Sequence, residues 1–550
     1  MSKIALGLLL VALCSPVAAA DASMEDELNG YLDTLFSTGS LNIQGLPILT
    51  GPLQARFYEH RSFQPAWSDA SKVEQLLALL ASAEKDGLDP EDYNLSSLRT
   101  MSVSADTESQ PSAAEREMLY TESFIRYAYH QRFGKVNPKT LVGTWNFQDE
   151  ITPDVDPVIT LNEAVESESL AEFRSRHIPR GPLYQNVQRA LHQYRAIAAA
   201  GGWRSTSEGK TLRAGDRDTR VPELRQRLLV TGDLADSAAT ADRQIFDDAL
   251  DAAVKRFQAR HGLDADGAVG PGTLGAMNVP VSARVNQLRL TLERARWVFG
   301  ALDSSFVLVN IAGAEVYVVE DGERVWQRRA MVGKTYRKTP IFRGLMTYLE
   351  INPTWTVPPG ILRNDVLPKV RQDPDYLARS NMSVLDRSGK PIDPSTVDWN
   401  ALKGMPYTFR QEPGPTNSLG LIKFMFPNEH FVFLHDTPNR TLFSRADRNF
   451  SSGCIRVEDP FSLASVLLRG QDDWSEPAVV AAVETGQTRR VSLKQPWPVY
   501  ILYWTAEADG TGQVHFFRDA YQRDAALLEA LDAAPVIDPR MTIAVASNGY

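Results

Sequence analysis

The sequence predicts a multidomain α+β protein with a helical scaffold, a small helical module and a mainly-β domain that contains an insertion. Its 550 residues, 43% of them hydrophobic, supply apolar side chains for several packed cores. Up to about residue 280 the apolar residues recur with the helical period. Beyond about Ser304, short apolar or alternating runs are separated by turn residues, which indicates strands.

A secretory signal is predicted over residues 1–20. Lys3 precedes the apolar run Ile4–Cys14, Pro16 interrupts that run, and Ala18–Ala20 offers small residues for cleavage. The run is short for a helix that spans a bilayer. We therefore expect export to the periplasm, with association to the inner membrane if the signal is not cleaved.

The charge pattern limits the classes of partner. A formal net charge of −10 argues against nucleic acid as the main partner. One basic cluster still stands out in the β-rich part, and it contains Arg324, Arg328, Arg329, Lys334, Arg337 and Lys338. Two interpretations remain open for this cluster, an anionic substrate nearby or a solvated strand face. We expect no metal, because the histidines lack metal-ligand spacing.

Residues 21–205 are predicted to form the helical scaffold. Ser71 and Glu74 have the spacing of a capping box before an apolar helical face, and Ser112 and Glu115 repeat that spacing before a helix that extends to about residue 132. The histidines here are scattered. This part of the chain is therefore expected to be structural.

Residues 213–280 are predicted to form the small helical module. Apolar residues line one helix near Val221–Leu229 and a second near Leu250–Phe257, and Gly262 gives the second helix its stop. The segment Phe257–Gly270 resembles the repeat of peptidoglycan-binding domains. That resemblance implies targeting to the cell wall, and the alternative is an inert spacer.

Strands dominate the predicted mainly-β domain, residues 304–490. Asp321-Gly322 between two apolar runs is a hairpin signal. Trp355 lies between prolines, so it is expected at a strand end or facing a cleft. The polar segment 361–415 interrupts the strands and is expected to be a capping insertion, either a lid or a surface decoration. Residues 491–550 are expected to be a strand/helix extension that completes the scaffold.

Cys454 is the only cysteine after residue 20, so it has no disulfide partner within the exported chain. A lone thiol in an oxidising compartment can form off-pathway disulfides. Its presence therefore indicates a reactive role, that of a nucleophile. The alternative is a buried cysteine that acts as a small hydrophobe. Ser451, Ser452 and Gly453 before it predict a turn, and Arg456 after it fits poorly in an apolar core.

His435 is the predicted partner of this cysteine. It ends an expected strand, Phe431–His435, in which period two places Phe431 and Phe433 on the same face as His435. A neutral imidazole there can accept a proton, and a thiolate would be stabilised beside an imidazolium. Backbone N–H groups of a turn that ends at the nucleophile can stabilise an oxyanion, and Gly453 permits their close approach.

The segment His435–Pro438, followed by Ser451–Val457, resembles the signature of the L,D-transpeptidases of the YkuD type, and Asn352–Pro359 resembles the same family. The order of signal, helical scaffold, peptidoglycan-binding module and catalytic domain with an inserted capping subdomain is similar to the large periplasmic, YcbB-like branch. Ser452 stands where many relatives carry histidine, and this branch tolerates serine.

The resemblance implies an acyl transfer that forms 3→3 cross-links in peptidoglycan. Cys454 would attack the third residue of a tetrapeptide stem, usually a diaminopimelate, and release the terminal D-alanine. His435 would act as base and then as acid, and Gly453 and Cys454 would supply oxyanion donors. An amine of a neighbouring stem would then take the acyl group.

The other expected site residues are Ser452 in the catalytic turn and four substrate contacts, namely Arg456, Trp355, Ser451 and Gly420. We expect no cofactor, inhibition by carbapenems, and peripheral association with other wall-synthesis enzymes. Two alternatives remain open. A cysteine L,D-carboxypeptidase or peptidase would use the same pair with water as acceptor, and a wall-binding protein would have no catalysis.

Overall fold

The computed structural model describes residues 16–38, 41–103, 111–147, 156–177, 181–235, 242–299, 302–373, 375–402, 404–471 and 473–538. Most of the expected signal, residues 1–15, lies outside these segments. The chain divides into two compact units. Met1–Asn137, Asp149–Arg180 and Ala530–Tyr550 form the first, and Pro138–Gln148 and Gly181–Glu529 form the second.

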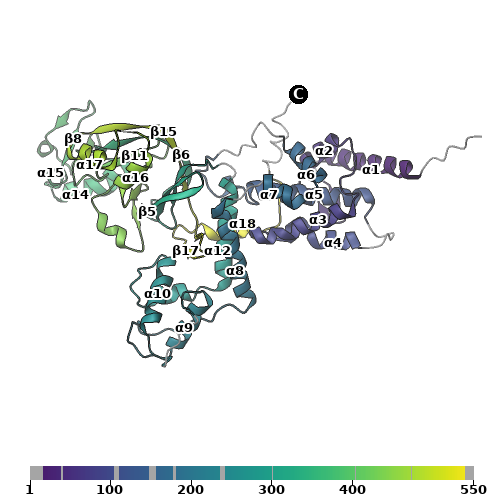
Figure 1. Ribbon diagram of the computed structural model, residues 1–550. Coiled ribbons are helices and arrows are strands. Elements are labelled where there is room, and N and C mark those ends of the chain that lie inside the picture. The colour runs from purple at the N-terminus through teal and green to yellow at the C-terminus, as the bar shows by residue number, and fades with distance from the viewer. Residues whose placement is uncertain are drawn as a thin grey trace, which may run out of the picture. The chain divides into compact units, whose positions relative to one another are not determined.

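The first unit is helical, as expected for a scaffold (Figure 1). Its helices are α1 (Pro16–Thr38), α2 (Gly51–His60), α3 (Ala70–Ala81), α4 (Leu95–Val103), α5 (Ala113–Phe133), α6 (Pro157–Glu166) and α7 (Leu170–His177), and its one short hairpin joins β1 (Asn42–Ile43) to β2 (Leu46–Pro47) among the described residues. Helix α5 is buried along most of its length. Among the described residues, no helix of the chain is long and apolar enough to cross a membrane.

The two predicted capping boxes had different outcomes. Ser112 and Glu115 form the box at the start of α5 and are confirmed. The box at Ser71 and Glu74 is wrong, because the N-cap of α3 is Asp69, whose side chain accepts a hydrogen bond from Ser71 N. An Asp two residues upstream is an equally good cap, and the helix begins there instead.

The peptidoglycan-binding-like module lies in the second unit. Its helices α9 (Val221–Val230), α10 (Asp248–Arg260) and α11 (Pro271–Met277) share one apolar core. Beyond α10 the module contacts a hairpin of β16 (Ala506–Ala508) and β17 (Val514–Phe516). The His261 ring stacks on Phe516 with centroids 5.7 Å apart, and the Arg260 guanidinium donates to the Val514 carbonyl at 3.4 Å. The module is thus packed onto the rest of its unit.

A nine-stranded sheet forms the core of the second unit, in the order β13-β5-β14-β12-β11-β6-β15-β3-β4. In chain order its strands are β3 (Phe306–Asn310), β4 (Glu315–Glu320), β5 (Glu323–Gly333), β6 (Phe342–Ile351), β11 (Ile422–Met425), β12 (Leu434–His435), β13 (Asn449–Ser451), β14 (Ile455–Val457) and β15 (Arg489–Leu502). Because β4 also pairs with β5 through the predicted Asp321-Gly322 turn, the sheet closes on itself. Helices α16 (Pro460–Leu467) and α17 (Glu476–Glu484) contribute to its core.

The expected insertion is a compact subdomain of its own. Its elements are β7 (Trp355–Thr356), α13 (Pro359–Ile361), a π-helical turn (Leu362–Val366), α14 (Leu367–Gln372), α15 (Tyr376–Arg379), β8 (Met382–Leu385), β9 (Pro391–Ile392), a 3₁₀ turn (Pro394–Thr396) and β10 (Thr408–Gln411). The strands form a separate sheet in the order β7-β10-β8-β9 over an apolar core. The subdomain begins at Trp355, before the expected residue 361, because β7 pairs with β10.

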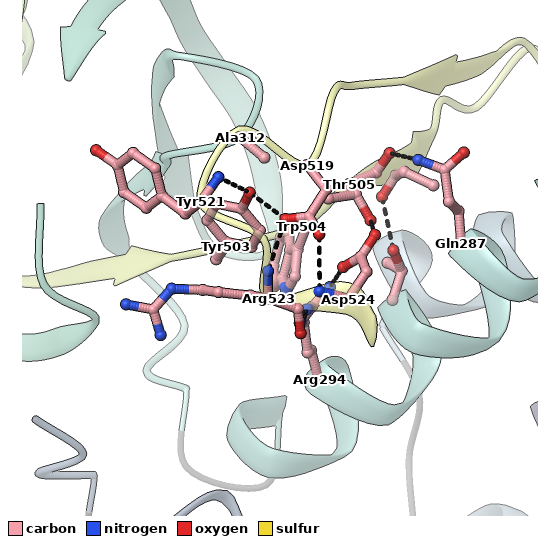
Figure 2. Close-up of polar contacts among 12 residues, drawn as sticks. Gln287, Arg294, Ala312, Tyr503, Trp504, Thr505, Asp519, Tyr521, Arg523 and Asp524 are labelled. Carbon is pink, nitrogen blue, oxygen red and sulfur yellow. Dashed lines mark hydrogen bonds and ion pairs between the residues drawn. The ribbon is translucent and has the colours of Figure 1, made fainter. Parts of the chain in front are cut away.

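The segment that begins with β15 (Arg489–Leu502) was expected to be an extension, but it forms part of the main sheet. Strand β15 crosses the expected boundary at residue 490 and pairs with β6 and β3 inside the main sheet. The segment that follows it is tied to helix α12 (Val281–Phe299), which packs on α8 (Pro182–Ala199). Figure 2 shows these ties: Arg294 binds Asp524 at 2.7 Å, and Gln287 donates to the Thr505 carbonyl at 3.2 Å. Helix α18 (Asp524–Asp532) begins there.

Candidate active site

The predicted nucleophile lies in a tight turn between β13 and β14. Both strands pair with β5, β13 in parallel and β14 in antiparallel orientation. Ser451 Oγ donates to the Cys454 carbonyl at 2.6 Å and accepts from Gly453 N at 3.1 Å. Gly453 has a φ of +122°, a conformation that strongly favours glycine. The turn therefore holds Cys454 half-buried at the end of a strand.

Ser452 connects this turn to the capping insertion. The Arg337 guanidinium donates to Ser452 Oγ at 2.9 Å and to Asp365 of the insertion at 2.5 Å. One arginine thus contacts the residue two before Cys454 and the subdomain that we expected to be a lid. Other members of the expected basic cluster are paired as well, since Arg328 binds Asp459 and Arg329 binds Glu458.

A row of polar residues crosses the sheet beside this turn. Glu350 on β6 pairs with Lys423 on β11, Lys423 pairs with His435 on β12, and His435 pairs with Arg456 on β14. Directly paired residues project to the same face of a sheet. Cys454 stands two residues before Arg456 and has the same strand parity. The sheet therefore brings the predicted nucleophile, the predicted base and two cations to one face.

His435 is held as a neutral imidazole. Its Nδ1 lies 2.5 Å from the Asp436 carbonyl, so Nδ1 carries the proton and Nε2 keeps a lone pair. Burial lowers the pKa of His435 to about 3, and the nearby charges of Arg456 and Lys423 act in the same direction. At neutral pH the ring is a proton acceptor.

Cys454 is protonated in the same state. Its Sγ lies 3.7 Å from the Phe431 carbonyl, to which the thiol donates. Burial raises the pKa of the thiol, while a backbone hydrogen bond from Phe433 and the charges of Lys423 and Arg456 oppose that rise. In the resting site both groups are therefore neutral, so the thiolate of the expected pair has to form during the reaction.

The expected strand Phe431–His435 is shorter than predicted. Only Leu434 and His435 belong to β12, and Phe431 has a φ of +53° and is 77% exposed. The parity of Phe433 and His435 still places both on the side of Lys423, whose Nζ lies 4.4 Å from the centre of the Phe433 ring. The part of the prediction that concerns Phe431 is wrong, because the backbone turns there to offer its carbonyl to Cys454.

Comparisons with known families match three parts of the chain. Residues 53–191 match a "Scaffold domain", residues 217–277 a "Putative peptidoglycan binding domain", and residues 304–483 an "L,D-transpeptidase catalytic domain" of the YkuD family. The last range contains His435, Lys423 and Cys454.

Residues 304–483 are an L,D-transpeptidase catalytic domain.

A curated relative supports this assignment. A Haemophilus influenzae protein described as "Putative L,D-transpeptidase" is 33% identical over 252 residues, which is 45% of this chain. The chain spans 50% of that relative's length. The fold class predicted from the sequence, with helical scaffold, peptidoglycan-binding module and mainly-β catalytic domain, is confirmed.

Solved L,D-transpeptidases were also matched. One from Stackebrandtia nassauensis is 15% identical, covers 54% of this chain and 97% of its own, and has a TM-score of 0.21. LdtMt1 in complex with imipenem is 15% identical, covers 36% of this chain and 59% of its own, and has a TM-score of 0.17. With TM-scores this low, neither structure bears on the fold of this chain.

The expected substrate contacts of the transpeptidase domain lie in different places. Arg456 belongs to the polar row beside Cys454. Trp355 lies on the edge strand β7 and packs, half-buried, against the core of the insertion. Gly420 has a φ of +66°, and a Cβ there would overlap the Asp436 side chain. Ser451 is engaged within the turn.

Two features of the candidate site were missed. Lys423 pairs directly with His435 on one side, as Arg456 does on the other, and its only sequence signal was a charge inside the apolar strand Ile422–Met425. The His435 ring is oriented by backbone groups, the carbonyls of Asp436 and Leu419, which no residue type could reveal. The Asp436 carboxylate accepts from Leu421 N and Arg440 instead.

Proposed function

We propose that this protein forms 3→3 cross-links in peptidoglycan through an acyl-enzyme on Cys454. The observation that carries the proposal is the polar row of the sheet, which brings neutral His435 to the face of Cys454 within an L,D-transpeptidase catalytic domain. A protonated thiol beside a neutral base is suited to general-base activation at the moment of attack.

In the first half-reaction, Nε2 of His435 accepts the thiol proton while Cys454 Sγ attacks the carbonyl carbon of the third stem residue, a diaminopimelate. The carbon–nitrogen bond to the terminal D-alanine breaks, and the departing amine takes the proton from His435. In the second half-reaction, an amine of a neighbouring stem attacks the thioester, gives its proton to His435 and restores the thiol. The two half-reactions together return Cys454 and His435 to their starting protonation states.

Charge supports the substrate class. Stem peptides carry carboxylates, and Lys423 and Arg456 present two cations on the same sheet face as Cys454. Lys423 is only weakly paired, since its Nζ lies 3.9 Å from Glu350. Burial lowers the pKa of both cations, so a bound carboxylate would gain from pairing with them.

The capping insertion acts in this proposal as a lid that orders the stem over Cys454. Its link to the catalytic turn is Arg337, which contacts both Asp365 and Ser452. Asp365→Asn weakens this link without removing side-chain volume. We expect it to raise KM for a stem peptide more than it lowers the alkylation rate of Cys454, and equal effects on both would contradict a lid.

The proposal includes the periplasm as the site of action, a cleaved signal, and carbapenems as inhibitors. The peptidoglycan-binding match at residues 217–277 supports contact with the wall. An association with other wall-synthesis enzymes is part of the same proposal.

The test is product analysis. The purified protein is incubated with disaccharide tetrapeptide, and Cys454→Ala serves as the matched control. Dimers linked 3→3 with release of D-alanine support the transpeptidase. Tripeptide without dimers would show that water is the acceptor and the protein is an L,D-carboxypeptidase. Unchanged tetrapeptide with retained binding to wall sacculi would favour the non-catalytic alternative.

A further inference from the structure

The peptide bond between Gly453 and Cys454 is anchored from outside the catalytic turn. Thr339 Oγ1 donates to the Gly453 carbonyl at 2.8 Å and accepts from Gly333 N at 2.9 Å. Thr339 is fully buried, so no water competes for this hydroxyl. The single proton of this hydroxyl is used in the hydrogen bond to the carbonyl of Gly453, the residue before the nucleophile.

This anchor sets the direction of the Cys454 N–H. In a planar trans peptide the carbonyl and the N–H point in opposite directions, so fixing one fixes the other. Gly453 N–H already donates to Ser451. Cys454 N–H makes no hydrogen bond in the described part of the chain. Of the two expected oxyanion donors, it is the one that remains available.

Thr339 is in turn held by Tyr521. The Tyr521 hydroxyl donates to the Gly333 carbonyl at 2.5 Å and accepts from Thr339 N at 3.1 Å. Its backbone carbonyl accepts from Lys338 Nζ at 2.9 Å. One tyrosine thus closes both ends of the loop 333–339.

Tyr521 is fixed by the segment after β15. Its N–H donates to the Tyr503 hydroxyl at 3.0 Å, and Tyr503 donates to Asp519 at 2.6 Å (Figure 2). The two tyrosine rings stack with centroids 5.6 Å apart. A continuous path of hydrogen bonds therefore runs from Asp519 to Gly453. Tyr503 and Tyr521 both lie beyond the family match, which ends at residue 483.

We infer that Thr339 and Tyr521 are positioning residues that aim the Cys454 N–H at the oxyanion, so that the segment after β15 is a working part of the active site. The inference rests on the proposed acyl transfer. Glycine at 453 resists rotation of its peptide poorly, which is why an external anchor matters. The anchor should therefore matter only for reactions in which a carbonyl oxygen becomes negatively charged, and the reactivity of the thiol and of His435 should not depend on it.

That difference gives a test, because two reactions of the same thiol differ in their need for an oxyanion donor. Acylation by imipenem passes through a tetrahedral oxyanion when Sγ attacks the ring carbonyl. The ring carbon–nitrogen bond then breaks, and the nitrogen takes the thiol proton by way of His435. Alkylation by iodoacetamide displaces iodide at a methylene carbon and forms no such oxyanion.

The experiment measures both rates for the full chain and four variants. Thr339→Val removes the hydroxyl at constant shape, Thr339→Ser keeps it, and Tyr521→Phe removes the next link. Tyr500→Phe is the control. It removes the hydroxyl of a tyrosine on β15, and that hydroxyl donates to Asp303 at 2.6 Å. Removing an oxyanion donor costs about 10²–10³-fold, and misaiming one should cost roughly 10- to 100-fold.

We expect Thr339→Val and Tyr521→Phe to slow imipenem acylation while the alkylation rate and its pH profile stay as in the wild type. Thr339→Ser and Tyr500→Phe should acylate normally. Equal slowing of both reactions in Thr339→Val would reduce the anchor to a folding role and overturn the inference. Undiminished acylation would overturn it too. A wild-type protein that alkylates but reacts with neither imipenem nor tetrapeptide would instead overturn the proposed function.

Discussion

The most specific consequence of the site is that His435 stays neutral far into the acidic range. Burial beside Arg456 and Lys423 lowers its pKa from 6.5 to about 3 in the folded protein. As pH falls below 6.5, His435 binds a proton in the unfolded chain, whereas His435 in the folded chain stays neutral. His435 therefore contributes stability that is complete above pH 6.5 and is lost as pH falls towards 3.

The magnitude follows from the shift. One pKa unit corresponds to about 1.4 kcal/mol, and the unfolded histidine is half protonated at pH 6.5, so acidification from pH 6.5 to 4.5 should remove roughly 2 kcal/mol through this one group. The whole interval from 6.5 to about 3 corresponds to roughly 5 kcal/mol. His435→Gln lacks the titrating ring and should lose none of this amount, so the difference between the two proteins isolates the contribution.

Two measurements check this prediction. Carbon-13 NMR of labelled histidine, with His435 assigned by its absence in His435→Gln, should show a signal that does not titrate between pH 8 and 5. Hydrogen exchange of the Ile455 amide, which donates to Phe433 inside the sheet, reports the stability of the catalytic strands in both proteins. A His435 signal that titrates near pH 6.5, or parallel loss of protection in both proteins, would refute the reasoning.

Three further predictions concern other parts of the molecule. Lys423→Met removes a charge that favours the Cys454 thiolate, so the pH profile of iodoacetamide alkylation should move upward by about one unit; an unmoved profile contradicts it. Gly420→Ala should destabilise the domain by about 1–3 kcal/mol, because φ is +66° and the added Cβ meets Asp436; an unchanged melting temperature argues otherwise. Deletion of residues 213–278 should weaken binding to sacculi while imipenem still acylates Cys454, and unchanged sacculus binding would remove the targeting role.

The sequence could identify the chemistry because the key residues are local. Cys454 sits in a short turn whose serines and glycine are all visible in the chain, and His435 shares its motif with the residues that follow it. The capping box at Ser112 is local as well, since both partners lie within one helical turn. Features of this kind depend on neighbours within a few residues.

The rest of the site depends on register between distant strands. Lys423 meets His435 only because β11 pairs with β12, and Thr339 meets Gly453 across a separation of more than one hundred residues. Backbone groups such as the Asp436 carbonyl carry no residue signature. The burial that keeps both groups neutral also depends on the packing of distant strands, since it lowers the pKa of the imidazole and raises the pKa of the thiol.

The central claim, that Cys454 is acylated at a carbonyl with the help of His435, is tested most directly by the mass of the intact protein after incubation with imipenem. The account predicts a gain of one intact drug equivalent, located on the peptide that contains Cys454, fast in the wild type, slow in His435→Ala and absent in Cys454→Ala. An adduct that persists in Cys454→Ala, or no adduct on a folded wild-type protein whose thiol still reacts with iodoacetamide, would contradict it.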